Sequence, residues 1–66
     1  MQIKINGREE ELKDASTLEI LAEQKQLIKN NIVMEVNGNI IPLEQWPETA
    51  LKKGDVIEII SFVGGG

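Results

Sequence analysis

The residues with the clearest chemical potential stand at the end of the chain. Gly64, Gly65 and Gly66 follow directly on an apolar segment that ends at Val63. Glycine has no Cβ and is free in φ and ψ, so an enzyme can close around such a segment and reach its terminal carboxyl group. We therefore predict that Gly66 carries a reactive carboxylate and that Gly64 and Gly65 thread into a partner protein.

The composition argues against chemistry elsewhere in the chain. Its 66 residues include no Cys and no His. These types supply the most reactive nucleophile, the commonest general base and the commonest metal ligand. We therefore expect no catalytic residue, no metal site and no stably bound cofactor. The net charge of -4 argues against nucleic acid as a partner, because phosphate backbones are bound by clustered Lys and Arg.

The apolar segments are short. None approaches the roughly 18 residues that a membrane-spanning helix needs. At the start of the chain, residues 1–5 alternate apolar and polar types instead of forming the core of a signal peptide. The absence of Cys suits a reducing compartment. We expect a cytoplasmic protein with no membrane contact.

Strands are predicted over residues 1–5, 8–12, 32–36, 40–41 and 56–63, with a clear alternation of apolar and polar residues at 1–5 and 32–36. Turns are expected at Asn6-Gly7 and Asn37-Gly38, because both residue types tolerate positive φ. The last segment is apolar on both of its faces except at Glu58 and Ser61, which indicates burial on two faces and a central strand that the helix covers on at least one side.

A helix is predicted to begin with a capping box, in which the Ser16 hydroxyl accepts a hydrogen bond from the Glu19 amide. The apolar spacing indicates that the helix ends near residue 26 and that Leu27 and Ile28 fold back onto the core. The residues predicted on its buried face are Leu18, Leu21 and Ala22.

Two further segments have predicted roles. Residues 44–47 should form one helical turn that ends before Pro47, because the residue preceding proline is pushed out of the α region. Trp46 should cover one end of the core, with a partner contact as the alternative. Phe62 and Val63 must face opposite sides of a strand, so we expect at least one to be buried and treat both as partner-docking candidates.

The element order is therefore β, β, α, β, β, a short helical turn, and β. Fold rules then predict an α+β fold of the ubiquitin-like β-grasp type, with a mixed sheet of about five strands packed on one helix. The first and last strands should pair in parallel at the centre. We expect residues 1–63 to form one domain and residues 64–66 to form a flexible glycine tail.

The chain also resembles a known family. The residues that carry the resemblance are the Asn6-Gly7 turn, Val36-Asn37-Gly38, Ile41-Pro42, Trp46, the segment 51–59 and the ending Phe62-Val63-Gly64-Gly65-Gly66. Together, in so short a chain, they are similar to the ThiS family of sulfur carriers in thiamine biosynthesis. The resemblance covers essentially the whole sequence.

The resemblance implies that Gly66 is the reaction centre. A ThiF-like adenylyltransferase would use MgATP to form an acyl-adenylate at the Gly66 carboxylate. A cysteine persulfide on a sulfur-donor enzyme would then supply sulfur to give a thiocarboxylate, which a ThiG-like thiazole synthase would consume. The chain itself would be a carrier and a co-substrate of these enzymes, monomeric when free.

A glycine ending is shared by other proteins, so three alternatives stay open. One is a sulfur carrier for another pathway, such as the small subunit of molybdopterin synthase. The second is a ubiquitin-like modifier whose Gly66 forms an isopeptide bond with a lysine. The third is a purely structural interaction domain.

Overall fold

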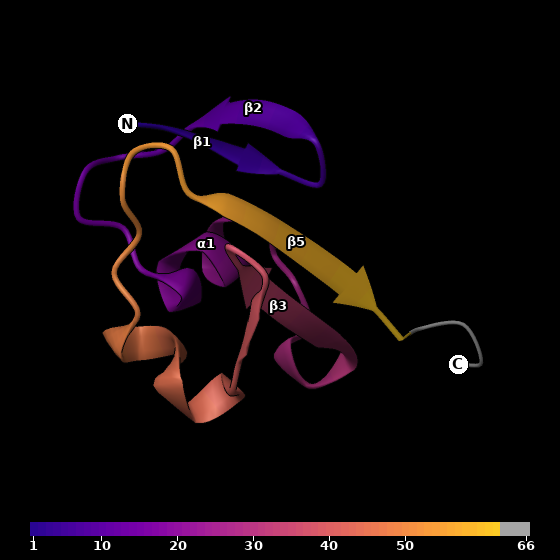
Figure 1. The fold of residues 1–66 in the computed structure, drawn as a ribbon. Helices are drawn as coiled ribbons and strands as arrows, with labels where there is room; N and C mark the ends of the chain where they lie inside the picture. The colour runs from indigo at the N-terminus through magenta and orange to yellow at the C-terminus, as the bar shows by residue number, and fades with distance from the viewer. Residues whose placement is uncertain (63–66) are drawn as a thin grey trace.

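The computed structural model describes residues 1–62, so Val63 and the predicted tail 64–66 lie outside the described part of the chain. The described residues form a mixed sheet of five strands in the order β2-β1-β5-β3-β4, with one α-helix against one face (Figure 1). The strands are β1 (Gln2–Ile5), β2 (Arg8–Glu11), β3 (Ile32–Val36), β4 (Asn39–Ile41) and β5 (Val56–Ser61). The predicted α+β fold is confirmed.

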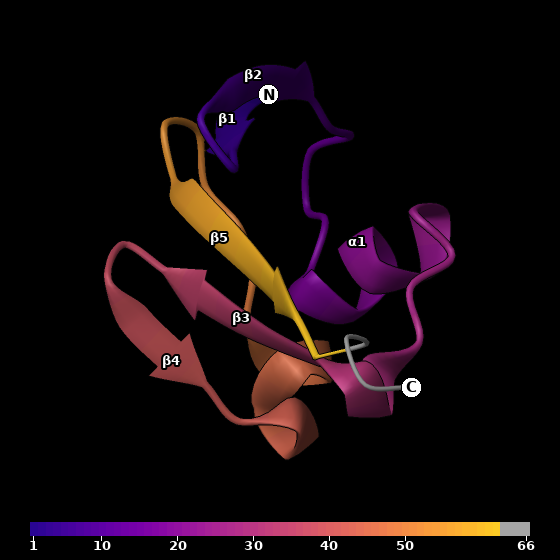
Figure 2. The same ribbon diagram turned by 90° about the vertical axis from the view of Figure 1, so that its right-hand side faces the viewer.

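The central strand is β5, as predicted. It pairs in parallel with β1, where Ile5 lies opposite Ile57, and antiparallel with β3 over the five residues of that strand. Two antiparallel hairpins complete the sheet on either side, β1 with β2 and β3 with β4. Figure 2 shows β5 between the two hairpins, with the helix on one side only.

The helix α1 (Leu18–Gln24) begins one residue later than the capping box predicts. Its N-cap is Thr17, whose Oγ1 accepts from the Ile20 amide at 3.2 Å. Ser16 instead donates its hydroxyl proton to the Lys13 carbonyl oxygen at 2.7 Å. The Ser16 carbonyl accepts from Leu51 at 2.9 Å, so the backbone before the helix pairs with a distant segment. This tertiary pairing sets the start of the helix.

The helix ends at a left-handed residue. Gln26 has a φ of 57°, and its amide donates to Glu23 at 3.0 Å while the Leu27 amide donates to Ala22 at 3.0 Å. This pair of bonds is the Schellman arrangement, which usually places glycine at the position that Gln26 holds. Leu27 packs against the core as predicted, but Ile28 is 65% exposed, so its predicted burial is wrong.

Two short 3-10 helices connect the strands, η1 (Lys29–Asn31) and η2 (Leu43–Glu48). The helical turn predicted to end before Pro47 continues through this residue. The Thr49 amide donates to the Trp46 carbonyl oxygen at 3.2 Å, and Pro47 occupies the second position of the turn closed by this bond, a position that suits proline.

Trp46 is 1% exposed and donates from Nε1 to the Ile41 carbonyl oxygen at 2.9 Å. Trp46 therefore belongs to the core, as predicted, and its buried side chain leaves almost no surface for the alternative role of contacting a partner.

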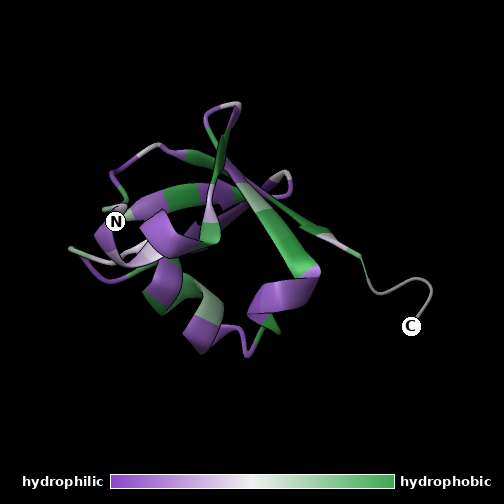
Figure 3. Ribbon diagram, turned by 90° about the horizontal axis from the view of Figure 1, so that it is seen from below, coloured by the Kyte–Doolittle hydropathy of each residue, from purple (hydrophilic) through white to green (hydrophobic). Residues whose placement is uncertain are grey.

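The core lies between α1 and one face of the sheet. The three predicted helix positions are fully buried there. They pack with residues from every part of the described chain: Ile3, Ile5, Leu12, Ile32, Met34, Trp46, Leu51 and Ile57. Figure 3 shows the resulting alternation of hydrophobic and hydrophilic segments along the ribbons.

The predicted burial of β5 on both faces is wrong. Ile57 is fully buried and Ile59 is half-buried on the side of α1, but Val56 and Ile60 are each 42% exposed. No helix covers the opposite side of the sheet within residues 1–62. The strand is therefore central in its hydrogen bonding and one-sided in its burial.

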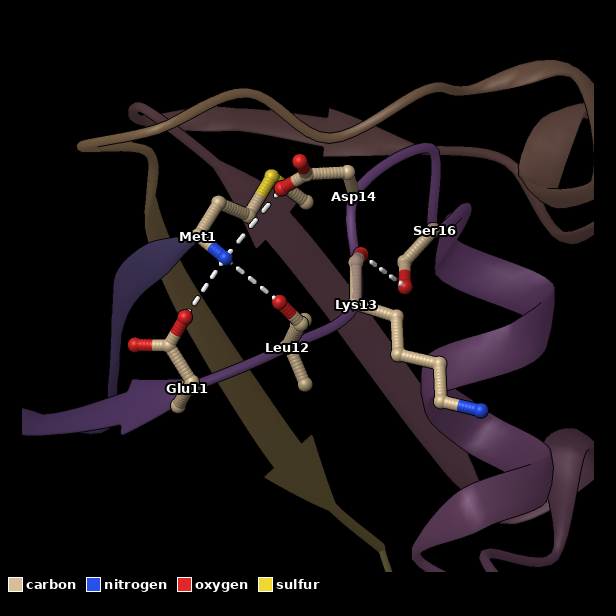
Figure 4. Close-up of polar contacts among 6 residues, drawn as sticks. All are labelled: Met1, Glu11, Leu12, Lys13, Asp14 and Ser16. Atoms are coloured by element: carbon tan, nitrogen blue, oxygen red, sulfur yellow. Dashed lines mark hydrogen bonds and ion pairs between the residues drawn. The ribbon is translucent and has the colours of Figure 1, made fainter.

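The first residue is tied to the segment after β2 (Figure 4). The Met1 ammonium group contacts Glu11 Oε2 at 2.7 Å, the Leu12 carbonyl oxygen at 2.6 Å and Asp14 Oδ1 at 3.3 Å. The hydrogen bond that this ammonium group donates to Glu11 is the main reason that its pKa is raised above its ordinary value of 8.0. These contacts hold the edge hairpin to the chain that leads into α1.

Candidate functional site

The candidate site is the end of β5, because this strand leads into the glycine segment. Gly64, Gly65, Gly66 and Val63 lie outside the described residues, so their predicted roles stay predictions. The described part of the site is β5 itself and Phe62. The structure shows which hydrogen bonds the segments beside β5 make to this strand.

On one side, the Asn6 side chain extends the parallel ladder between β1 and β5. The Asn6 amide donates to the Ile57 carbonyl oxygen at 2.9 Å, the last backbone bond before the chain turns away with Asn6 at a φ of 49°. The Asn6 Oδ1 atom then takes the place of a backbone carbonyl and accepts from the Ile59 amide at 2.8 Å. Its Nδ2 atom lies 3.4 Å from the Ile59 carbonyl oxygen. The turn residue therefore holds the second half of β5.

On the β3 side, Asn37 bonds the start of β5 through its backbone and its side chain. Its amide donates to the Val56 carbonyl oxygen at 2.7 Å, and its Oδ1 atom accepts from the Val56 amide at 2.9 Å. Its Nδ2 atom donates to Asp55 Oδ1 at 3.0 Å, and Asp55 Oδ2 accepts from the Lys52 amide at 2.8 Å. Asp55 is nearly buried, so these bonds satisfy a carboxylate that water can barely reach.

The sequence predicted Asn6 and Asn37 only as turn residues. Their adjacent glycines give a strong hairpin signal, and nothing local shows that both side chains point to the same strand. The shared feature that could have indicated it is the repeated Asn-Gly pair flanking the two strands that neighbour β5. Asp55 also stabilises the turn before β5, because its Oδ2 atom accepts from the Lys52 amide.

Phe62 follows β5 and is 62% exposed. Its amide donates to the Asn31 carbonyl oxygen at 2.7 Å, which prolongs the pairing with the segment before β3. Its backbone is held while most of its ring is open to solvent. This placement is compatible with the predicted docking role, which the structure does not test.

Two further findings concern metal binding and membranes. Residues 1–62 contain no group of three or more Asp, Glu, His or Cys that could hold a metal ion. Within the same residues, no helix is long and apolar enough to cross a membrane.

Comparison with known proteins agrees over the whole sequence. Residues 2–66 match the ThiS family. A sulfur carrier protein ThiS from Bacillus subtilis is 38% identical over 97% of the chain and 98% of that protein. A thiazole synthase from Paramagnetospirillum magneticum is 32% identical over the full chain, which spans only 20% of that protein. The crystal structure of a thiamine biosynthesis protein, ThiS, from Geobacter metallireducens superposes with a TM-score of 0.85 at 25% identity and covers both chains completely.

The sheet order, the single helix and the central parallel strand pair define a ubiquitin-like β-grasp protein. Within this class, the match of residues 2–66 to a family model identifies the family. The chain belongs to the ThiS family.

Proposed function

We propose that this protein is a sulfur carrier of thiamine biosynthesis and that it acts through the carboxyl group of Gly66. The observation that carries the proposal is membership of the ThiS family, with a match that runs through residue 66. The Bacillus subtilis relative named as a sulfur carrier protein aligns over almost its whole length. The absence of Cys and His from the chain fits a protein whose reactive group is a backbone terminus.

The first proposed step is activation of the carboxylate by an adenylating enzyme of the ThiF type. A Gly66 carboxylate oxygen attacks the α-phosphorus of MgATP, and pyrophosphate leaves. A free carboxylate is a poor electrophile, whereas the resulting acyl-adenylate has AMP as its leaving group. The enzyme and its metal ion supply the positive charge that this reaction needs, because the described part of the chain has no metal-binding cluster.

The second proposed step introduces sulfur. The outer sulfur of a cysteine persulfide on a donor enzyme attacks the Gly66 carbonyl carbon and displaces AMP. The product is an acyl disulfide that keeps the sulfur–sulfur bond of the persulfide. A thiol then attacks the donor cysteine sulfur and breaks this bond, which leaves a thiocarboxylate on the carrier and a disulfide between the thiol and the donor cysteine. Gly64 and Gly65 would let the chain pass through the narrow entrance of each enzyme, since neither has a Cβ atom.

The proposed acceptor is a thiazole synthase of the ThiG type. The Paramagnetospirillum magneticum relative supports this choice, because a protein named thiazole synthase includes a segment similar to the entire chain. In that relative the carrier-like segment and the remaining sequence share one polypeptide. A separate carrier would meet the synthase by binding instead.

The folded part supports this role by holding β5 on both sides. The backbone and the two asparagine side chains bond β5 from its first residue to Ile59, and the Phe62 amide is bonded beyond it. Such a support keeps the origin of the glycine segment in one place, so a partner that recognises the domain also locates the carboxyl group. Preorganisation of this kind lowers the entropic cost of binding.

Mass spectrometry of the intact protein tests the proposal. The protein is incubated with MgATP, the adenylating enzyme from its own organism and a persulfide donor. We expect one oxygen to be replaced by sulfur, and a variant that lacks Gly66 to stay unmodified under the same conditions. Failure of the intact protein to gain sulfur would contradict the proposal.

The same experiment separates the alternatives. Covalent conjugates with other proteins would identify a modifier. Transfer of sulfur to the large subunit of molybdopterin synthase but not to thiazole synthase would assign the carrier to another pathway.

A further inference from the structure

The two hairpin turns that hold β5 consist of a residue pair with chemistry of its own. The backbone nitrogen that follows an asparagine can attack the side-chain carbonyl carbon Cγ, and a glycine at that position has no side chain to obstruct the approach. Glycine follows asparagine at Asn6-Gly7 and Asn37-Gly38 and nowhere else in the sequence. The other asparagines precede Asn or Ile: Asn30, Asn31 and Asn39.

The attacking nitrogen is equally available at both turns. Gly7 and Gly38 have similar φ values of 84° and 88°, and a Cβ atom added at either would meet nothing within 4 Å. Among residues 1–62, neither glycine amide donates a backbone hydrogen bond. Both asparagines are exposed, so water reaches both turns. A difference in reactivity between the turns must therefore come from the asparagine side chains.

The two asparagine side chains are held with different strength. The attack turns the planar carboxamide into a tetrahedral centre and finally expels Nδ2, so hydrogen bonds made by the planar group oppose it. Each Oδ1 atom accepts one β5 amide, at 2.8 Å for Asn6 and 2.9 Å for Asn37. The Nδ2 atom of Asn37 also donates to the Asp55 carboxylate at 3.0 Å, whereas that of Asn6 lies 3.4 Å from a neutral carbonyl oxygen.

The bond to Asp55 is the stronger of the two Nδ2 contacts, because its acceptor is charged. Asp55 is only 8% exposed, so losing the bond would also leave a nearly buried carboxylate with one partner fewer. The contact of the Asn6 Nδ2 atom is long, and its loss costs little. The surrounding structure therefore protects Asn37 and leaves Asn6 less protected.

From this contrast we propose that Asn6 is a deamidation site of the folded domain, and that the Asp55 carboxylate protects Asn37 from the same reaction. The Gly7 nitrogen loses its proton to water and bonds to Asn6 Cγ, while Nδ2 takes up a proton and leaves as ammonia. Water then opens the succinimide ring. Attack of water at Cγ breaks the new bond and gives aspartate. Attack at the Asn6 backbone carbonyl carbon breaks the original peptide bond to Gly7 and gives isoaspartate.

The two products have different effects on β5. Aspartate keeps an oxygen atom where Asn6 Oδ1 stood, so this residue still accepts from the Ile59 amide. Isoaspartate leads the main chain through Cβ and Cγ, which adds one carbon atom to a turn of two residues. Ile5 and Arg8, which lie opposite each other across this turn, then lose their register. Isoaspartate formation therefore releases the second half of the strand that leads into the glycine segment.

Peptide mapping of the incubated full chain by mass spectrometry tests the site. Aspartate and isoaspartate are quantified at residues 6 and 37 over time at neutral pH. In guanidinium chloride only the local sequence acts, so the two sites should react at similar rates. In the folded protein Asn6 should react about tenfold faster than Asn37, which is the effect of one hydrogen bond to a charged group.

Asp55→Asn is the matched variant, because it removes the charge and keeps the shape of the side chain. It should speed the reaction at Asn37 and leave the rate at Asn6 unchanged, whereas general unfolding would speed both. Equal rates at the two sites in the folded protein would overturn the proposal. Conversion of Asn6 in guanidinium chloride but not in the folded protein would do the same.

The effect on β5 needs a separate measurement. A chain made by chemical synthesis with isoaspartate at position 6 is compared with the Asn6→Asp variant by hydrogen exchange. The Ile59 amide should exchange faster in the isoaspartate chain, while Asn6→Asp should match the unmodified protein. The same exchange rate at Ile59 in both chains would show that isoaspartate does not release β5.

Discussion

Replacing Asn6 with glycine should show how much the turn side chain contributes to holding β5. Glycine accepts the φ of 49° at this position without strain, so the change removes the side chain and keeps the turn. The bond from the Ile59 amide to Asn6 Oδ1 has a length of 2.8 Å, whereas the bond from Nδ2 is long at 3.4 Å. We assign about 1 kcal/mol to the first and little to the second.

A glycine also makes the unfolded chain more flexible, which costs up to about 1 kcal/mol of stability. The expected total loss for Asn6→Gly is therefore about 1–2 kcal/mol. Asn6→Asp keeps the acceptor oxygen and tolerates the same φ, so it should lose less than about 0.5 kcal/mol. Urea unfolding followed by fluorescence suits this comparison, because Trp46 is the single tryptophan and is buried.

The matched control is Gln26→Gly. Gln26 also has a positive φ, of 57°, and its side chain makes no hydrogen bond within residues 1–62. Glycine should relieve backbone strain there and raise stability by about 0.5–1 kcal/mol. The two glycine substitutions should therefore have opposite signs.

Hydrogen exchange gives the local readout. The Ile59 amide should lose protection in Asn6→Gly relative to the Ile57 amide, which lies in the part of β5 that pairs in register with β1. Unchanged protection at Ile59, or equal destabilisation by Asn6→Asp and Asn6→Gly, would refute the role assigned to the Asn6 oxygen.

Three further predictions concern the parts around β5. Trp46→Phe removes the donor to the Ile41 carbonyl and leaves a void, so circular dichroism should report a loss of about 2 kcal/mol or more in urea. Asp55→Ala breaks the contacts at the start of β5 and should cost about 2 kcal/mol in the fluorescence assay. The raised pKa of the Met1 ammonium group means that its contribution is complete below pH 8.0 and is lost as the pH rises through the raised value. The urea midpoint should therefore fall above pH 8.0, and acetylation of Met1 or Glu11→Gln should flatten that dependence.

Sequence patterns predicted the fold well where the local signal and the tertiary structure agree. The two Asn-Gly turns, the alternating strands β1 and β3 and the buried side of α1 all follow from neighbours in the sequence. The start of α1 did not, because Ser16 and Thr17 are both favourable N-cap residues and Ser, the more favourable type, is not the one used. What distinguishes them is the pairing of the Ser16 carbonyl with Leu51, a contact across more than half of the chain.

The candidate site also has one part that the sequence predicted and one part that it did not. Its position at the end of the last strand could be predicted from the glycine segment. The side chains that hold that strand could not, because Asn6 and Asn37 are distant from β5 in sequence and their turn role already explains their type. The burial of Ile28 was wrongly predicted for a related reason, since apolar character does not determine which of two adjacent residues faces the core.

The wrong prediction for β5 is informative about function. A strand that is largely apolar on both sides normally indicates two covered faces, but here Ile60 is 42% exposed and no helix covers the side opposite α1 within residues 1–62. Local sequence and local burial disagree at this strand, and natural proteins tolerate such disagreement mainly where function requires it.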